Sequence, residues 1–371
     1  MKKLLTLLCL AGAFATPPVL ADPKPILIGQ SASLTGGQAA YGRDVRDGIE
    51  AAIAAANAKG GIRGRPIQLV TLDDAGKREG VLANTKTLVE QHHVAALVGY
   101  TSGAGVEATL PYLSDAGVPL IGPATGNMGI RDGFHRFLFH VRAGYSDEMN
   151  KVVKHLVTTN LKRFAIVYLD DVGPANPQSM VNALQQNGLQ PVASAAINRN
   201  ADKFDKEAER LLKGEPEVVL AISNAKPVIK LVQAMKAKGY TGQYAIASFA
   251  GLSMIDELKQ DSRGLILSQV LPPPSAKHHV RLIGTYQADM GAHKPQAVLN
   301  YTSLEGYIAA RVLIEGLKRS AGDGGAKLVA GLESMERVDL GGYEISFSPH
   351  SHHGSRFVNP GIVNAAGHLV F

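Results

Sequence analysis

Hydroxyl side chains gather where an apolar strand pattern gives way to a helical one, at Tyr100, Thr101 and Ser102. Ser102 directly precedes the helical pattern, so its side chain can cap that helix while the first backbone N–H groups stay free. A helix N-terminus with hydroxyls and the tight turn that Gly103 permits suits an anion such as a carboxylate. The alternative is a plain N-cap with no ligand.

Two further segments resemble reactive motifs but do not complete them. Asp73 and Asp74 end a strand, where adjacent side chains point to opposite faces and cannot jointly flank one bond. We expect a structural role for both. The glycine-rich segment 60–64 follows a helix and precedes a strand, which is the reverse of a dinucleotide-binding fingerprint. It is expected to form a helix end and a turn.

Three histidines, His350, His352 and His353, have a spacing that can bind zinc. No Asp or Glu lies close to them in the sequence, so a solvated loop is expected and neither a metal nor another cofactor is predicted. The chain also lacks a Gly-x-Ser-x-Gly elbow, and no Lys-Ser or Lys-Thr follows a glycine-rich loop. We therefore do not expect an enzyme.

The composition is that of a globular protein with enough apolar residues for two cores. The chain has 371 residues, of which 45% are hydrophobic and 19% charged. Trp is absent, and the single cysteine, Cys9, lies in the first apolar run. The remaining chain can form no disulfide and no cysteine-based metal or catalytic site. The net charge of +6 is not concentrated in a Lys/Arg-rich run, so nucleic acid is not expected as a partner.

The first 21 residues have the pattern of a secretory signal peptide. Lys2 and Lys3 precede an apolar run over 4–15, and Ala21 ends a stretch of small residues before Asp22. The run is too short to span a bilayer, and no later apolar stretch is long enough either. We expect a cleaved leader and a periplasmic protein that does not insert into the membrane. A buried N-terminal helix is the alternative.

Short apolar runs alternate with helical patterns along the rest of the chain. In the first part, strands are predicted at 26–29, 67–72, 95–99 and 118–122, and helices at 44–57, 81–91 and 105–115. In the second part, strands are predicted at 164–168, 218–222 and 244–247, with helices at 179–186, 204–212 and 228–238. Three prolines at 272–274 indicate a crossover, two helices are predicted at 277–290 and 299–318, and short β segments follow from 342. The alternation predicts an α/β protein with two doubly wound parallel sheets.

Several short motifs, in this order, resemble the leucine/isoleucine/valine-binding proteins. These are periplasmic solute receptors of ABC importers with the type I periplasmic binding, or Venus-flytrap, fold. Each motif alone is weak, but their order and spacing cover essentially the whole chain after the leader. The motifs are SLTGG at 33–37, YG at 41–42, ANAKGGIRGR at 56–65, LDD at 72–74, VGYTSG at 98–103, IGPAT at 121–125, FSP at 347–349 and GS at 354–355.

The resemblance implies two discontinuous lobes joined by three hinge crossovers. The first lobe would comprise residues 22–142 and 273–348, and the second residues 143–272 and 349–371. A small carboxylate-bearing ligand is then expected between the lobes, which close by hinge motion. The implied protein partner is the membrane permease of the importer, and we expect a monomer.

The family also implies which first-lobe residues bind the ligand. Ser102, Thr125 and the backbone of Ala124 would hold its carboxylate, and Tyr41 would cover its apolar part. Packing of Tyr41 on its own helix is the alternative. Because the chain has no Trp, we expect the cleft to close on Tyr41, Tyr100 and Phe249. The first-lobe candidates are Tyr41, Tyr100, Thr101, Ser102, Ala124 and Thr125.

The second lobe departs from the amino-acid receptors of the family. Those receptors hold the ligand ammonium with an acidic side chain, because a buried cation needs a paired charge. Phe249 occupies that position here, Val172 and Asn224 lie near two family tyrosines, and Asp171 is the best-placed substitute acid. A carboxylate without the ammonium, such as an aromatic, keto or hydroxy acid, therefore fits better than an α-amino acid.

Two other functions remain open at this point. A receptor subunit of the same fold would sense the ligand instead of delivering it for transport. A hydrolase of the doubly wound class is the third alternative, although the chain shows no nucleophile motif.

Overall fold

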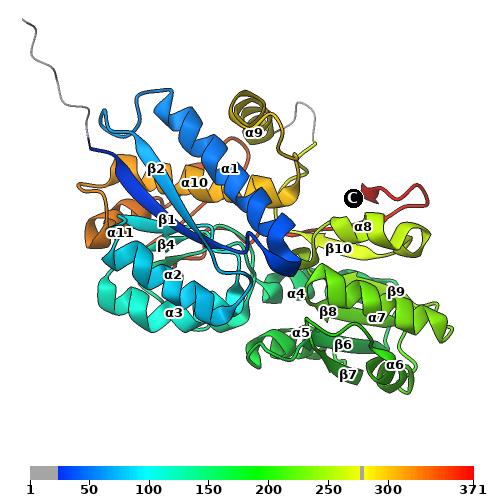
Figure 1. Cartoon of the computed structure of the whole chain (residues 1–371). Coiled ribbons are helices and arrows are strands. Elements are labelled where there is room, and N and C mark those ends of the chain that lie inside the picture. Colours follow the sequence, from blue (N-terminus) through cyan, green and yellow to red (C-terminus); the bar gives the residue numbers. More distant parts are fainter. Residues whose placement is uncertain (1–23, 276–279) are drawn as a thin grey trace, which may run out of the picture.

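The computed structural model describes residues 24–275 and 280–371, which form two α/β lobes (Figure 1). The predicted signal peptide at 1–21 and the predicted helix start at 277 lie outside the described residues. The doubly wound α/β architecture is confirmed. No helix within the described ranges has the length and apolar character needed to cross a membrane.

The first lobe is built on a parallel sheet of five strands in the order β2-β1-β3-β4-β5. Side chains on the two faces of β1 enter different cores. Ile26 and Ile28 pack in the core under α1 and α10, whereas Leu27 packs on the core under α2 and α3. This alternation follows from the two-residue period of a strand. The elements up to the first crossover are β1 (Ile26–Ala32), η1 (Gly36–Gln38), α1 (Ala39–Asn57), β2 (Ile67–Asp73), α2 (Arg78–Glu90), β3 (Ala96–Val98), α3 (Gly103–Ala116), β4 (Leu120–Ile121), η2 (Met128–Ile130) and β5 (Leu138–Phe139).

Later segments complete the first lobe by packing against α1. The helices α1 and α10 approach so closely that a Cβ on Gly48 would lie 1.8 Å from the carbonyl oxygen of Ser303, and one on Gly306 would lie 2.0 Å from that of Val45. Glycine is therefore required at both positions. This contact places the N-terminal turn of α10 beside α1 at the mouth of the cleft. The later elements are α9 (Arg281–His293), α10 (Tyr301–Arg319), α11 (Gly325–Glu333), β11 (Val338–Asp339) and β12 (Glu344–Ile345).

The second lobe is built on a sheet of seven strands in the order β14-β13-β10-β9-β8-β6-β7. Its strands are parallel except for β13 and β14, which add an antiparallel edge. The two faces again carry separate cores. The elements are α4 (Tyr145–Thr158), β6 (Phe164–Leu169), α5 (Ala175–Gln185), β7 (Pro191–Ile197), α6 (Asp205–Leu212), β8 (Val218–Ile222), α7 (Ala225–Ala237), β9 (Gln243–Ile246), η3 (Ser248–Ala250), α8 (Ser253–Leu258), η4 (Lys259–Ser262), β10 (Ile266–Gln269), β13 (Asn359–Val363) and β14 (Leu369–Val370).

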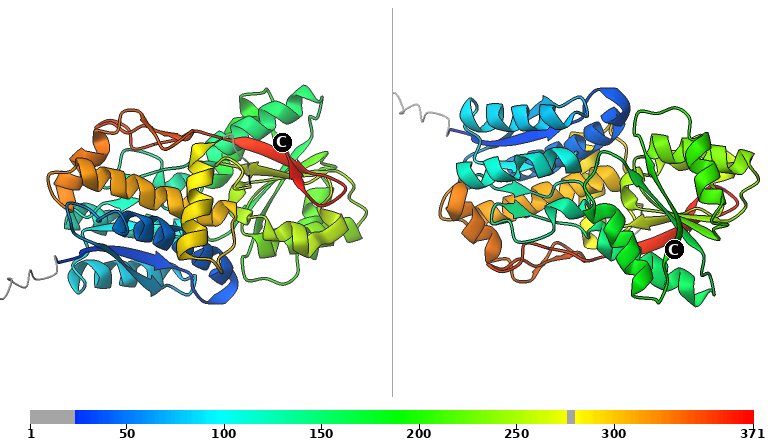
Figure 2. Two further views of the ribbon diagram at one scale, coloured as in Figure 1. Left: turned by 90° about the horizontal axis from the view of Figure 1, so that it is seen from above. Right: turned by 90° about the horizontal axis from the view of Figure 1, so that it is seen from below.

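The chain crosses between the lobes three times. The first crossing lies between β5 and α4, and the second lies between β10 and α9. Residues up to Gly354 remain with the first lobe, because His353 forms a bridge with His140 and the Gly354 N–H donates to the His140 carbonyl at 2.7 Å. The third crossing therefore follows Gly354, so the expected lobe boundary between residues 348 and 349 is wrong and is placed too early in the chain. Figure 2 shows the C-terminal segment, in red, against the second lobe.

Asp73 and Asp74 anchor the loop that leads into α1. The carboxylate of Asp74 accepts hydrogen bonds from the hydroxyls of Ser31 at 3.0 Å and Ser33 at 2.8 Å. Asp73 accepts from the hydroxyl of Thr35 at 2.6 Å on the other side of the strand end. The structural role predicted for this pair is confirmed, and it fixes the position from which α1 starts.

Candidate functional site

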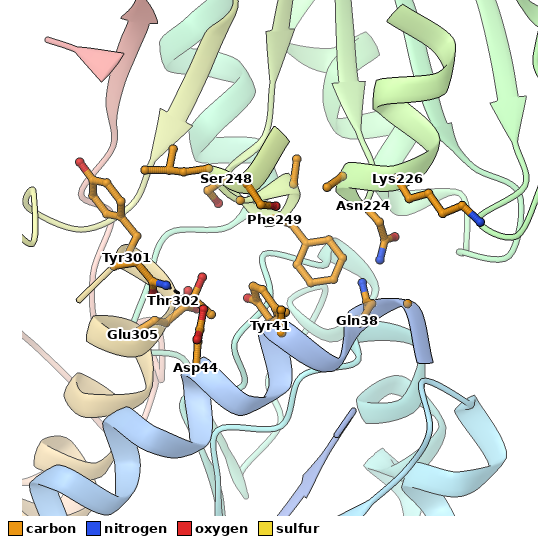
Figure 3. Close-up of a pocket in the computed structure, with 18 of the residues that line it drawn as sticks. Gln38, Tyr41, Asp44, Asn224, Lys226, Ser248, Phe249, Tyr301, Thr302 and Glu305 are labelled. Carbon is orange, nitrogen blue, oxygen red and sulfur yellow. Dashed lines mark hydrogen bonds between the residues drawn. The ribbon is translucent and has the colours of Figure 1, made fainter. Parts of the chain in front are cut away.

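Two adjacent cavities lie between the lobes, at the carboxyl ends of the strands. The larger has a volume of about 360 Å³ and the smaller about 30 Å³. Gln38 from the first lobe and Arg199 and Phe249 from the second line both of them. Figure 3 shows the larger cavity, with Tyr41 and Phe249 in its middle. Crevices at the carboxyl ends of parallel strands are where open α/β sheets bind ligands.

An aromatic pair crosses the cleft between the two lobes. The ring centroids of Tyr41 on α1 and Phe249 on η3 are 5.3 Å apart at an interplanar angle of 69°. The Tyr41 hydroxyl donates to the carbonyl of Ala124 at 2.7 Å, which holds its ring in place. Burial raises the pKa of Tyr41 well above its ordinary value, so this hydroxyl stays protonated. The pair therefore links the lobes across the larger cavity, and Phe249 also lines the smaller one.

The smaller cavity is bordered on the first lobe by the N-terminus of α3. Ser102 caps this helix, because its Oγ accepts the Gly105 N–H at 3.1 Å, and its own hydroxyl hydrogen remains available. The Thr125 Oγ1 accepts the Asn127 N–H at 3.2 Å and lies 3.4 Å from the Tyr145 hydroxyl. Ser102, Gly103 and Thr125 all line the cavity. Two hydroxyls and the positive end of a helix dipole thus face one small space, an arrangement that suits an anion.

The second lobe presents unpaired polar atoms to the same cleft. Ser223 and Asn224 follow β8, and the Ser223 Oγ and Asn224 Oδ1 are buried without a hydrogen-bond partner among the described residues. Ser223 lines the smaller cavity and Asn224 the larger one. An unpaired buried polar group costs about 1–3 kcal/mol. A ligand that supplies the missing partners would recover part of that cost.

Four predicted site residues lie outside the linings of both cavities. Tyr100 is fully buried in the core beside α2 and α3, with its hydroxyl 3.1 Å from the Thr85 Oγ1. The expectation that Tyr100 closes on a ligand is therefore wrong, because its ring packs in the core between the sheet and the helices α2 and α3. Thr101 is also fully buried, and its Oγ1 accepts the Ser33 N–H at 3.1 Å. Ala124 contributes only the carbonyl that holds Tyr41.

Asp171 likewise does not line either cavity. Its carboxylate forms a two-bond ion pair with Arg199, in which the Nη2–Oδ1 distance is 2.7 Å. The expectation that Asp171 replaces the missing acid is therefore not supported by its position. Val172, the next residue, does line the smaller cavity, together with Phe249.

Four charged residues that were not predicted from the sequence line the larger cavity. They are Arg199 from the loop after β7, Asp44 from α1, Lys226 from α7 and Glu305 from α10. Arg199 was missed because β7 itself was not recognised. The signal for Glu305 was available in part, since Asn300 is an N-cap and places Glu305 in the second turn of α10. Its orientation toward the cleft depends on the packing of α10 against α1.

A buried ion cluster spans the hinge behind the larger cavity. Arg142, which is 1% exposed, donates to Glu148 at 2.5 Å, to the Ser248 Oγ at 2.6 Å and to Glu305 at 3.4 Å. Burial by itself would lower the pKa of Arg142, but the charges of Glu305 and Glu148 outweigh it and raise that pKa. Burial raises the pKa of Glu305, and Arg142 offsets only part of the shift. One guanidinium therefore joins α4, α10 and η3.

The histidine segment is only partly the solvated loop that was predicted, because His350 is exposed whereas His352 and His353 pack against the first lobe. His352 is buried and stacks on Phe139, with ring centroids 3.8 Å apart, and its Nε2 lies 3.2 Å from a carboxylate oxygen of Glu333. The rings of His353 and His140 also stack, at 5.1 Å. These contacts bury His352 and His140 in the wall of the first lobe and leave His353 half-buried. In the described part of the chain, no group of three or more His, Cys, Asp or Glu side chains could hold a metal ion.

Comparisons with known proteins agree with this architecture. The family model for periplasmic binding proteins matches residues 25–367. An extracellular ligand-binding receptor from Verminephrobacter eiseniae has a similar structure, with a TM-score of 0.87 and 27% identity over 94% of this chain and all of that one. A substrate-binding periplasmic protein from Ralstonia solanacearum gives a TM-score of 0.83 and 27% identity over 93% and 99% of the two chains.

A curated relative matches a shorter region. The Leu/Ile/Val-binding protein homolog 2 of Brucella abortus is 39% identical over 104 residues, which is 28% of this chain. The chain thus matches about a quarter of that relative's length, 27%. Because the family model spans nearly the whole described chain, the chain belongs to the periplasmic binding protein family, of the leucine/isoleucine/valine-binding type.

Proposed function

We propose that this protein is the periplasmic substrate-binding component of an ABC importer, and that it captures a small carboxylate-bearing solute by closing its two lobes. The observation that carries the proposal is the smaller cavity. There the hydroxyls of Ser102 and Thr125 and the N-terminus of α3 face the unpaired Ser223 Oγ across the cleft. A carboxylate would accept hydrogen bonds from the first lobe, and the second lobe would contact the rest of the ligand.

Entry of a ligand requires the lobes or Phe249 to move. The smaller cavity, of about 30 Å³, is far below the roughly 300–1,000 Å³ of a typical ligand pocket. Because Phe249 belongs to the second lobe and packs on Tyr41 of the first, opening the hinge separates the two rings and enlarges the carboxylate site. Closure can then report binding only if the ligand binds the closed form more tightly than the open one. The closed form would dock on the permease.

The ligand class follows from Phe249 and from the relatives. The name of the Brucella abortus protein supports a ligand related to leucine, isoleucine or valine. An apolar ring at Phe249 favours a branched, aromatic, keto or hydroxy acid without a cation beside its carboxylate. Residues 1–21 are proposed to be a cleaved signal peptide. The proposed lobe limits are 22–142 with 273–354, and 143–272 with 355–371, and the protein is proposed to act as a monomer.

A ligand screen tests this proposal. Thermal unfolding is measured with amino acids, keto acids, hydroxy acids and aromatic acids, because a ligand at 100 times its Kd stabilises the folded state by about 2.7 kcal/mol. Each compound that stabilises the protein is then titrated by calorimetry against the double variant Ser102→Ala/Thr125→Ala. Losing two hydrogen bonds to a carboxylate should weaken binding at least about tenfold.

The control is Thr158→Ala, which removes an exposed hydroxyl at the end of α4. Thr158 lines neither cavity. The control variant should bind each compound as the parent protein does. Unchanged affinity in the double variant would place the carboxylate elsewhere. If no carboxylate-bearing compound stabilises the protein, the proposed ligand class is wrong.

A further inference from the structure

The larger cavity has an acidic end on the side of Phe249 away from the carboxylate site. Figure 3 shows Asp44, Glu305, Tyr301 and Thr302 together at one end, with Lys226 and Asn224 at the other. Asp44 projects from α1 and Glu305 from α10, so the contact between these two helices sets the distance between their carboxylates. Tyr41 and Phe249 lie between the two ends of the cavity (Figure 3).

The cations that line this cavity are already paired with acids outside its lining. Arg199 is bonded to Asp171, and the Lys226 Nζ lies 3.0 Å from a carboxylate oxygen of Asp202. Neither pairing neutralises the acidic end.

The two acids of the acidic end are incompletely paired. Within the described residues Asp44 forms no ion pair, and it accepts one hydrogen bond, from the amide of Asn300 at 2.7 Å. Glu305 shares Arg142 with Glu148, at the longer distance of 3.4 Å. Burial raises the pKa of both Asp44 and Glu305, and the Asn300 hydrogen bond to Asp44 and the Arg142 charge near Glu305 offset only part of these shifts.

A second observation shows that the cavity is built to receive polar groups. Asn224 lines it, is only 7% exposed, and carries an Oδ1 without a hydrogen-bond partner in the described ranges. Figure 3 shows its side chain directed into the space near Gln38. The rings of Tyr41 and Phe249 add aromatic surface, which attracts organic cations. The cavity thus offers hydrogen-bond acceptors at both ends, with the acids at one end, Asn224 at the other and aromatic surface between them, which suits an extended ligand with a positively charged donor.

We propose that the acidic end formed by Asp44 and Glu305 binds an ammonium group of the ligand, so that the transported solute carries a cation separated from its carboxylate by an apolar chain. This inference rests on the proposed function, because the carboxylate site is taken from it. Phe249 stands between the two sites and prevents one α-carbon from bringing both charges to their partners. The ligand class is therefore an ω-amino acid and not an α-amino acid.

Matched pairs of probes test the cationic site. Calorimetric titrations compare 4-aminobutanoate, 5-aminopentanoate and 6-aminohexanoate with butanoate, pentanoate and hexanoate, and include hexylamine and leucine. At one chain length or more, the amino compound should bind at least about tenfold more tightly than the acid without the amine. Asp44→Asn and Glu305→Gln should each reduce, severalfold, the ratio of the affinity for the amino compound to the affinity for the matching acid. Glu305→Gln changes a contact of Arg142 and could impair folding. Asp44→Asn leaves the contacts of Arg142 intact, so the test can be decided with that variant alone.

The control variant is Asp47→Asn, which removes a carboxylate from the same helix, paired with Lys294 and outside the cavity lining. It should keep the ratio of the parent protein. The inference is overturned if the affinity of each amino compound divided by that of the matching acid is one or less at every chain length. It is also overturned if this affinity ratio is unchanged in both Asp44→Asn and Glu305→Gln, and in either case the carboxylate proposal stands. Binding of hexylamine without any carboxylate would support the cationic site and refute the carboxylate. If no probe binds, this inference fails, while the carboxylate proposal is decided by the wider screen of keto, hydroxy and aromatic acids.

Discussion

Arg142 is the residue whose replacement should most strongly destabilise the hinge. Arg142→Met removes the bonds to Glu148, Ser248 and Glu305 and leaves two buried carboxylates without their cation. Removing one partner of a buried ion pair costs about 3–5 kcal/mol. Glu148 keeps two bonds from Ser248, one from its N–H at 2.8 Å and one from its hydroxyl at 2.9 Å. We therefore expect a loss near the lower limit, about 3 kcal/mol.

The companion variant Glu305→Gln should cost less. Its contact with Arg142 is longer, at 3.4 Å, and the amide oxygen of glutamine still accepts a hydrogen bond. A loss of about 1 kcal/mol is expected. As a control, Arg337→Met breaks an exposed pair with Glu344 and should change stability by less than about 1 kcal/mol.

The assay is urea unfolding followed by far-ultraviolet circular dichroism at pH 7 and pH 5, since the chain has no Trp for fluorescence. Burial already raises the pKa of Glu305, and loss of the Arg142 charge should raise it further. An acid with a raised pKa in the folded state binds its proton more readily there than in the unfolded state. The free energy of unfolding therefore falls as the pH rises from the pKa of Glu305 in the unfolded state through its raised pKa in the folded state, and it recovers on acidification. The destabilisation of Arg142→Met should be smaller at pH 5.

Two results would refute this reasoning. A cost below about 1 kcal/mol for Arg142→Met would show that the cluster contributes no more than an exposed pair. An equal cost at pH 5 and pH 7 would show that unpaired carboxylates are not its cause.

Three further predictions concern the cleft, the helix packing and the pH dependence. Phe249→Ala removes the aromatic contact across the cleft, so the radius of gyration from small-angle X-ray scattering should increase toward that of an open form. Gly48→Ala forces a Cβ against the backbone of α10 and should cost more than about 2 kcal/mol in urea unfolding, whereas Gly291→Ala, with open space around its Cβ position, should be neutral or stabilising. Burial and the nearby Arg131 charge lower the pKa of His353 to about 4, so the folded protein should lose stability as the pH falls from 6.5 toward 4. The drop in Tm over that interval should be smaller in His353→Gln, and an equal drop would contradict the assignment.

The strongly apolar strands and the long helices could be predicted from the sequence, because burial repeats with the period of each element. The predicted strand at 218–222 matches β8, and the predicted helix at 299–318 corresponds to α10. The edge strand β7 was missed. It begins with Pro191 and consists mostly of Ala and Ser, so it lacks the β-branched run that marks a buried strand.

The candidate site was predictable only where it consists of loops that follow strands. Ser102 and Thr125 were placed by that rule, and the structure brings both to one cavity. Tyr100 follows the same rule yet faces the core, because the direction of a side chain in a loop is not periodic. The position of Tyr100 next to Ser102 in the sequence therefore does not show whether the Tyr100 side chain faces the cleft or the core.

Hydrophobic patterning and short motifs are enough to predict two doubly wound α/β lobes, their order along the chain and the family. Which charges face the cleft depends on how distant elements pack together. Arg142 and Glu305 are 163 positions apart, and Asp44 meets Asn300 across 256 positions. Hydrophobic periodicity indicates which face of a helix or strand is buried. The partner of a buried charge comes from whichever distant element packs there, and no local pattern encodes that choice.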